Sequence, residues 1–185
     1  INRLVYGVGT RLITSWGEPA LGGVYKLAAI RNAAGEWDPR IKLSEQAIKV
    51  TTPGMQQIRR FVVDGEATCD AIYDELKTPH GGWMIVDPLD ITRHRPIARN
   101  TPFEDLLQPV FRAGRRVADP PPLAAIRRRV RDQLALFHSG IKRFENPHAY
   151  PVGLEKGLHD LKTRLILQAR DSERAGSPVA PKPGV

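Results

Sequence analysis

Residues 3–15 are RLVYGVGTRLITS, in which an apolar run leads into Gly7-Val8-Gly9-Thr10 and then into further apolar residues. Two glycines this close together let backbone N–H groups converge on one point, because no Cβ blocks the approach of a ligand. An apolar strand that feeds such a loop is the usual arrangement for holding a phosphate. A tight turn between two core elements would also use two glycines, so the local pattern leaves both interpretations open.

The composition indicates a basic protein with enough apolar residues for a core. The chain has 185 residues, of which 41% are apolar, and a net charge of +8, a balance that suits nucleic acid or a polyanionic small molecule. We expect neither a membrane-spanning helix nor a signal peptide. The lone cysteine, Cys69, cannot form an internal disulfide, which favours the cytoplasm. Since the chain begins without a methionine and residues 3–6 already resemble a strand, we expect a piece of a longer protein.

The first two thirds of the sequence predict short strands joined by turns. The strand segments are 22–31 and 39–44, which form a predicted hairpin, then 57–66, 82–90 and 106–119. Turn signals punctuate them at Thr52-Pro53-Gly54, at Asp64-Gly65 and at Ala113-Gly114. The pattern therefore predicts a mostly antiparallel β region.

The last third predicts two amphipathic helices, which makes the fold class α+β. The first helix, within residues 120–140, carries an apolar stripe at helical spacing, with most arginines off it: Leu123, Ile126, Val130, Leu134 and Phe137. The second, within 151–170, carries another: Leu154, Leu158, Leu161 and Leu165. Both stripes need a surface to pack against. The tail, 171–185, is rich in Pro, Ala, Gly and Ser and predicts disorder.

Seven blocks of sequence occur in the order found in nicotinate phosphoribosyltransferases. They are YGVGTRL (6–12), PALGGVYKL (19–27), PRIKLSE (39–45), KVTTPG (49–54), DPLDITR (87–93), LLQPVFRAGRRV (106–117) and NPHAYPVGL (146–154). On these blocks, the chain resembles the C-terminal portion of that family over nearly its whole length to about residue 170.

The resemblance implies a fold and a reaction. The family joins nicotinate to 5-phosphoribosyl 1-diphosphate, coupled to ATP hydrolysis, and forms nicotinate mononucleotide for NAD salvage. Its type II phosphoribosyltransferase fold is an irregular α/β barrel plus a β-rich domain, and it works as a homodimer with Mg²⁺. By this resemblance residues 1–20 would end the barrel, 21–120 would form the β-rich region, and 121–170 the helices.

The resemblance also implies which residues meet the substrate. The loop Gly7-Val8-Gly9-Thr10 is expected to hold the ribose 5-phosphate, with Gly9 and Thr10 as the main contacts. Arg11 and Lys26 are candidates for the substrate cleft, although a lysine that alternates with apolar residues on a strand is usually solvated. The family's phosphorylatable histidine and its nicotinate-binding arginine lie in the barrel part, so we expect no catalytic residue in this chain and no activity from it alone.

Other interpretations stay open at this stage. Asp87 and Asp90 could form a carboxylate pair for Mg²⁺ or acid–base chemistry, but turn and capping roles around Pro88 are favoured. No histidine pair has zinc-ligand spacing, so no protein-bound metal is expected. Alternative functions are a nicotinamide-type relative and a non-catalytic nucleic-acid-binding module. The latter rests on the arginine run 127–131, which would form a broad helical face without aromatic residues to stack on bases.

Overall fold

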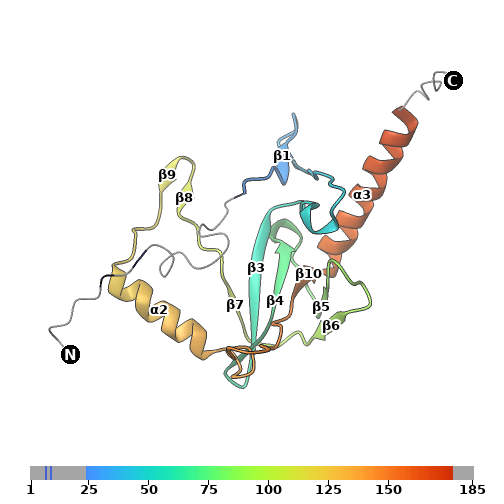
Figure 1. Cartoon of the computed structure of the whole chain (residues 1–185). Coiled ribbons are helices and arrows are strands. Elements are labelled where there is room, and N and C mark those ends of the chain that lie inside the picture. Colours follow the sequence, from blue (N-terminus) through green and yellow to red (C-terminus); the bar gives the residue numbers. More distant parts are fainter. Residues whose placement is uncertain (1–6, 8, 10–23, 177–185) are drawn as a thin grey trace, which may run out of the picture.

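A six-stranded sheet forms the centre of the computed structural model, which describes Gly7, Gly9 and residues 24–176 (Figure 1). The strand order is β6-β5-β10-β4-β3-β7. The bounds are β3 Gln56–Val63, β4 Glu66–Asp74, β5 Trp83–Val86, β6 His94–Ile97, β7 Phe103–Asp105 and β10 Val152–Glu155. Neighbouring strands are antiparallel except β10 and β4, which are parallel. The sheet curls, and the α+β class is confirmed.

The β3–β4 hairpin is the longest part of the sheet. Asp64 and Gly65 turn the chain with φ of 50° and 80°, the positive values that a two-residue hairpin turn requires. The predicted strand and turn are therefore confirmed. The strand that follows the turn, β4, was not expected from the sequence, yet Cys69 and Ala71 on it are completely buried.

Two further hairpins lie outside the central sheet. β1 (Ala29–Arg31) pairs with β2 (Trp37–Pro39), and β8 (Phe111–Arg112) pairs with β9 (Arg115–Arg116). The first hairpin is shorter than predicted, and residues 40–44 form no strand. It closes early because the Asn32 side chain accepts hydrogen bonds from the backbone N–H groups of Ala34 and Glu36, which fold residues 32–36 into the turn.

Each face of the central sheet carries its own cluster of buried side chains. One face holds Phe61, Cys69, Ala71, Tyr73, Trp83 and Ile85. On the other, Leu154 of β10 packs with Leu158 and Leu161 of helix α3 (Lys156–Gly176). The predicted second helix therefore begins later than expected, because Leu154 lies in a strand. It also runs past residue 170 to Gly176, since residues 171–175 contain no helix breaker, so the part of the predicted disordered tail up to Gly176 is helical. Residues 177–185 lie outside the described part.

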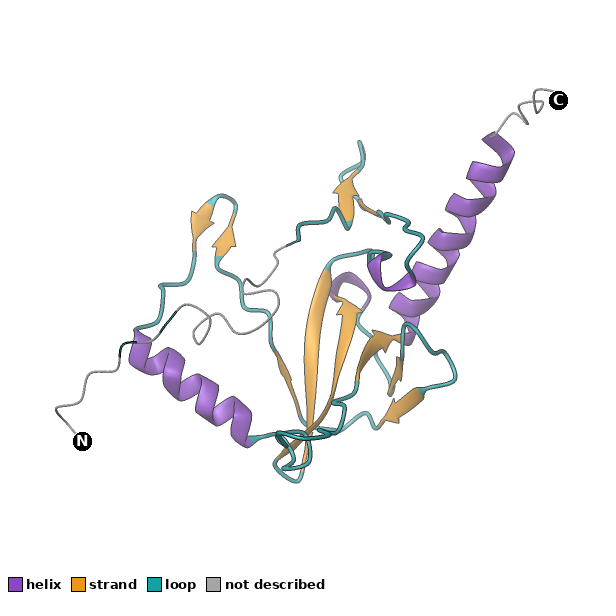
Figure 2. Ribbon diagram, in the orientation of Figure 1, coloured by secondary structure: helices purple, strands orange, loops and turns teal. Residues whose placement is uncertain are grey.

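Helix α2 (Leu123–Ala135) forms where the sequence predicts a helix but contains no buried residue. Its predicted apolar stripe is exposed: Leu123, Ile126, Val130 and Leu134 are 44–63% accessible. Within the described residues, no surface covers this stripe, so the expectation that it packs against a surface stays a prediction. Only Phe137, beyond the helix end, packs, with its ring edge-on to Tyr150 at 4.9 Å between centroids. Figure 2 shows α2 and the β8–β9 hairpin beyond the β7 edge of the sheet.

In the described part of the chain, no helix combines the length and apolar character needed to cross a bilayer.

Candidate functional site

The predicted phosphate loop is only partly described. Gly7 and Gly9 are exposed, and no heavy atom lies within 4 Å of a Cβ built on either residue. Val8, Thr10 and Arg11 lie outside the described residues. Lys26 is exposed in the irregular segment that precedes β1. The described residues therefore do not test this group of candidates, and their roles stay predictions.

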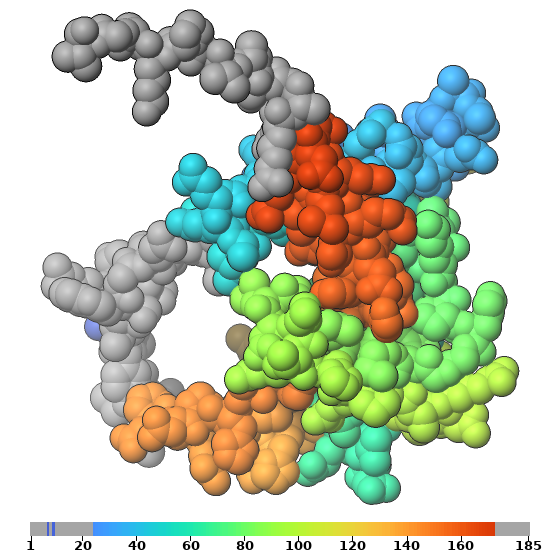
Figure 3. Space-filling view, turned by 90° about the vertical axis from the view of Figure 1, so that its right-hand side faces the viewer, coloured from blue at the N-terminus to red at the C-terminus, as the bar shows by residue number. Residues whose placement is uncertain are grey.

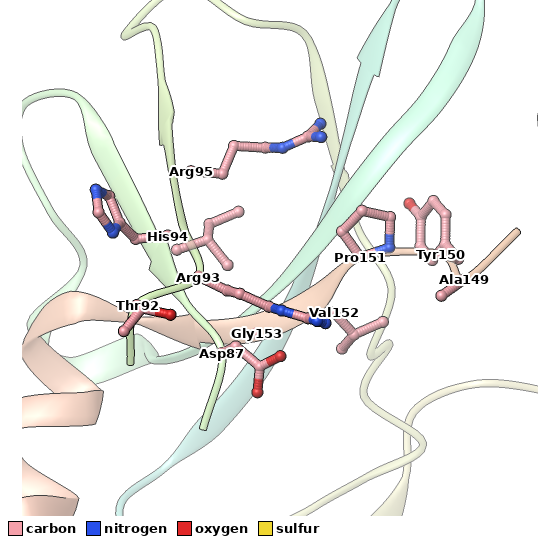
Figure 4. A pocket seen from close by; sticks show the side chains of 11 residues that line it. Asp87, Thr92, Arg93, His94, Arg95, Ala149, Tyr150, Pro151, Val152 and Gly153 are labelled. Carbon is pink, nitrogen blue, oxygen red and sulfur yellow. The ribbon is translucent and has the colours of Figure 1, made fainter. Parts of the chain in front are cut away.

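A cavity of about 480 Å³ lies beside β5, β6 and β10. Its walls come from the β5–β6 hairpin and from residues 149–153, which lead into β10. Figure 4 shows the Arg93 and Arg95 side chains reaching into the space between these segments, while His94 points away. Two guanidinium groups over an apolar floor can accept an anion, but no nucleophile paired with a base lines the cavity.

A buried ion pair lies behind this cavity. Arg60 of β3 donates to both carboxylate oxygens of Asp70 on β4, from Nε at 2.9 Å and from Nη2 at 2.8 Å. Both side chains are close to 90% buried, at 12% and 9% exposure. The cavity-lining Tyr150 donates its hydroxyl to Asp70 Oδ1 at 2.8 Å, and Arg60 Nη1 donates to Gln133 Oε1 of α2 at 2.7 Å. The network therefore joins the sheet, α2 and one wall of the cavity.

The charges in this network stabilise one another. The hydrogen bond to Asp70 raises the pKa of Arg60, despite burial that opposes the charge. Burial first, and then the hydrogen bond to Asp70, raise the pKa of Tyr150, because an ionised phenol there would lose its solvent and face a carboxylate. Tyr150 therefore stays a neutral donor at physiological pH and has the properties of a structural group.

A second pair crosses from β3 to the edge strand β7. Arg59 donates from Nε and Nη2 to the two Asp105 oxygens at 2.8 and 2.7 Å. Its guanidinium also lies over three aromatic rings, at 3.7 Å from Phe103, 4.8 Å from Trp83 and 5.0 Å from Tyr73. Such contacts hold a cation in a partly desolvated place. This arrangement covers one end of the core. The charges of Arg59 and Asp105 are engaged with each other, so neither is available to a substrate.

Asp87 and Asp90 serve the turn between β5 and β6, as favoured from the sequence. Asp87 Oδ1 accepts from the N–H groups of Leu89 and Asp90 at 2.8 and 3.2 Å. Asp90 Oδ1 accepts from Thr92, whose hydrogen bonds lower the pKa of Asp90, and Oδ2 pairs with Arg93 at 3.2 Å. The turn and capping roles are confirmed, and the two carboxylates do not form a site for an ion.

The described residues contain no group of three His, Cys, Asp or Glu side chains that could hold a metal ion. The sulfur of Cys69 is buried, and this burial raises the pKa of its thiol, so the thiol is unreactive. His138 and His148 stack with parallel rings, 6.5 Å between centroids, and the His138 Nδ1 accepts the N–H of Gly140. This part of the chain has the character of a scaffold.

Comparison with protein families identifies what the scaffold belongs to. Residues 55–162, more than half of the chain, match the model of the nicotinate phosphoribosyltransferase C-terminal domain. The chain belongs to this family. The matched residues include the central sheet, both buried ion pairs, the cavity and α2.

Individual relatives agree with this assignment. The nicotinate phosphoribosyltransferase of Bacillus subtilis (strain 168) is 33% identical over 87% of this chain and 35% of that protein. The one from Dictyostelium discoideum is 31% identical over 89% of this chain and 29% of that protein. The crystal structure of human nicotinic acid phosphoribosyltransferase superimposes with a TM-score of 0.62 at 24% identity, over 84% of this chain and 30% of that one. At that identity the likeness concerns the fold.

The chain spans about a third of the length of these nicotinate phosphoribosyltransferases. The buried pairs Arg59–Asp105 and Arg60–Asp70 were missed from the sequence. The visible signal was the Arg59-Arg60 dipeptide between Ile58 and Phe61, within a strand where alternate side chains face opposite sides of the sheet.

Proposed function

We propose that the chain forms the C-terminal part of a nicotinate phosphoribosyltransferase, which makes nicotinate mononucleotide and diphosphate from nicotinate and 5-phosphoribosyl 1-diphosphate, coupled to ATP hydrolysis. The observation that carries the proposal is the family match over residues 55–162, together with relatives of that name that extend well beyond this chain. In this proposal the chain has a supporting role, and the catalytic groups lie in the part of the enzyme that it does not span.

In this proposal the loop Gly7-Val8-Gly9-Thr10 holds the 5-phosphate of the donor. Phosphoribosyl transfer passes through an oxocarbenium-like sugar, so the enzyme gains most by fixing the distal phosphate and the anomeric carbon relative to the base. Backbone N–H groups beside glycines can approach a phosphate closely without a side chain in between. Arg11 and Lys26 are the basic residues proposed to add charge in the substrate cleft.

The Asp87–Asp90 pair does not fit a Mg²⁺ ion, because Asp87 Oδ1 and both oxygens of Asp90 are engaged in the turn and with Arg93. The described residues also contain no group of three His, Cys, Asp or Glu side chains placed to hold a metal ion. We therefore assign no step of the reaction to a metal held by this part of the chain. The residues that handle Mg²⁺, ATP and nicotinate are proposed to lie in the part of the enzyme that this chain does not span, and the complete enzyme is proposed to be a cytoplasmic homodimer.

Reconstitution tests the function. The chain would be mixed with a fragment of the Bacillus subtilis relative that contains the residues outside the alignment with this chain. We expect neither component alone to form nicotinate mononucleotide, and the mixture to form it when nicotinate, donor and ATP are supplied. Product from the chain alone would show that the catalytic groups are misplaced in this proposal. An associated but inactive mixture would contradict the proposed function.

A further inference from the structure

Residues 106–135, called the arm below, are exposed to an extent unusual for ordered structure. Every residue from 107 to 132 is exposed, although the segment contains the β8–β9 hairpin and all but the last turn of α2. The arm contains these exposed large apolar side chains: Leu107, Val110, Phe111, Val117, Leu123, Ile126, Val130 and Leu134. Figure 1 shows α2 and the β8–β9 hairpin at the left, away from the central sheet and on the side opposite α3, and Figure 3 shows the opposite face, where α3 (red-orange) lies over the body of the molecule. Apolar surface on this scale indicates a docking face.

The base of the arm is fixed to the sheet. Gln133 receives the hydrogen bond from Arg60, the carbonyl of Leu136 accepts from Ala67 N–H at 2.8 Å, and the carbonyl of Leu134 accepts from Lys142 Nζ at 3.3 Å. The C-terminal end of α2 is thus held in one orientation before any partner arrives. A surface ordered in advance loses less conformational freedom on binding.

The helix presents its apolar and charged residues side by side. At about 100° per residue, the stripe from Leu123 to Leu134 occupies an arc of about 80°. Arg127 and Arg131 follow directly on one side of the stripe, and Gln133, tied to the sheet, lies on the other. A partner must therefore cover an apolar strip while meeting guanidinium groups along its free edge.

The charge of the arm favours one class of partner over a second copy of the chain and over nucleic acid. The arm has seven arginines against two aspartates, and in the described part of the chain no arginine of α2 takes part in an ion pair. Two copies that met arm to arm would bring these guanidinium groups together, which opposes a second copy as the occupant. A nucleic acid would satisfy the arginines but leave the apolar stripe uncovered. The occupant that fits is a protein surface with an apolar centre and carboxylates at its edge.

We propose that the arm docks onto the part of the nicotinate phosphoribosyltransferase that this chain does not span, through an apolar surface edged with acidic residues. This inference rests on the proposed function for the identity of the partner. It is independent of which residues carry out the reaction. The length of the relatives supports this proposal, because about two thirds of each relative lies outside the match and is available to cover the apolar stripe of α2.

The test measures the affinity of the full chain for the Bacillus subtilis fragment described above, by biolayer interferometry. Val130→Glu places a charge in the stripe, and Leu167→Glu on α3 is the matched control, since the two side chains are 52% and 55% exposed on helices. We expect Val130→Glu to weaken binding about tenfold or more, as for a central interface residue, and Leu167→Glu to leave it unchanged. Arg127→Glu should weaken binding and reduce its dependence on salt.

Several results would overturn the proposal. Failure of the fragment and the chain to associate would do so, as would equal affinities of Val130→Glu and of the control for the fragment. Sedimentation could reveal a dimer of the chain that Val130→Glu dissociates, which would make a second copy the occupant. Binding of duplex DNA that depends on Arg127 at physiological salt would make nucleic acid the occupant. Formation of nicotinate mononucleotide that is unaffected by Val130→Glu would refute the docking face while leaving the proposed function intact.

Discussion

Removing the carboxylate of Asp70 should destabilise the fold more than any surface ion-pair change, because it leaves the Arg60 charge buried without its partner. Breaking a buried, hydrogen-bonded pair by changing one member costs about 3–5 kcal/mol. Asp70→Asn keeps the size of the side chain, so the cost reflects charge and hydrogen bonding. For a chain of this size, that loss corresponds to a fall in Tm of about 2–4 °C per kcal/mol.

The assay is urea unfolding of the full chain followed by Trp fluorescence and far-UV circular dichroism. Asp38→Asn is the matched control, because its partner Arg40 is 46% exposed and Asp38 itself 41% exposed. Exposed pairs contribute about 0–1 kcal/mol. Tyr150→Phe removes a single hydrogen bond to the same carboxylate and should cost about 1.5–3 kcal/mol, between the two.

A double variant distinguishes the loss of the ion pair from a simple loss of packing. Arg60→Met with Asp70→Asn removes both charges, so the double variant should recover much of the stability lost in Asp70→Asn alone. If Asp70→Asn cost no more than Asp38→Asn, the assignment of this pair as the link between the sheet and α2 would be refuted.

Three further predictions concern single positions. Gly54→Ala should lower the free energy of unfolding by about 1–3 kcal/mol, because Gly54 has a φ of +90° and a Cβ there would lie 3.0 Å from Asp74 Oδ2. Gly81→Ala is the control: open space surrounds Gly81, so this variant should stay within about 1 kcal/mol of the native chain. Equal effects of the two changes in urea unfolding would contradict this prediction. Cys69 should react with iodoacetamide only when the protein opens, because its thiol is buried with a raised pKa; native labelling at the rate of free cysteine would disprove it. Burial lowers the pKa of Lys162, so the unfolded state binds more protons than the folded state, and the free energy of unfolding should rise as the pH rises toward 10.5. A Lys162→Met variant should lack this pH-dependent rise. Identical profiles of stability against pH for the two proteins would refute the prediction.

The turns and the helices were the features that the sequence predicted best. Gly65 and Gly114 have positive φ angles, which glycine adopts without steric cost, and Asp64 has one that aspartate tolerates, so these residue types favour the two turns. Ala113 also has a positive φ, which its residue type does not favour. Strand β4 was missed because Asp70 and Asp74 interrupt its apolar pattern, and both are buried. Asp70 accepts from Arg60 and Tyr150 of other segments, whereas Asp74 accepts from the nearby Leu76 N–H at the end of the strand. A buried carboxylate in a strand resembles a loop until its partner is known.

The Arg60–Asp70 pair shows why the network could not be predicted. Counting back from the two-residue turn places Arg60 opposite Cys69. A bulge between Phe61 and Val62 shifts the register by one residue, so Arg60 meets Asp70. Neither the bulge nor its effect is visible in the amino-acid pattern, because it depends on how the whole sheet packs.

The predicted start of the second helix was wrong for a related reason. Leu154 and Leu158 are four residues apart and join the same buried cluster, so their spacing predicts one continuous helix. The chain instead passes from strand β10 into α3 between them, because residues 152–154 pair with β4 and residues 154–155 pair with β5. Helical spacing therefore identified the buried face correctly and the secondary structure wrongly.

The loop at Gly9 offers the most direct test of the central claim that this chain supplies part of a phosphoribosyltransferase site. In the reconstituted enzyme, the Michaelis constant for 5-phosphoribosyl 1-diphosphate would be compared for Gly9→Val and for the control Gly81→Val. A Cβ at either glycine meets no heavy atom within 4 Å, so neither change disturbs the described packing. We expect a rise of about tenfold or more for Gly9→Val alone, because its side chain would block the phosphate from the loop. An unchanged constant for Gly9→Val would contradict the account.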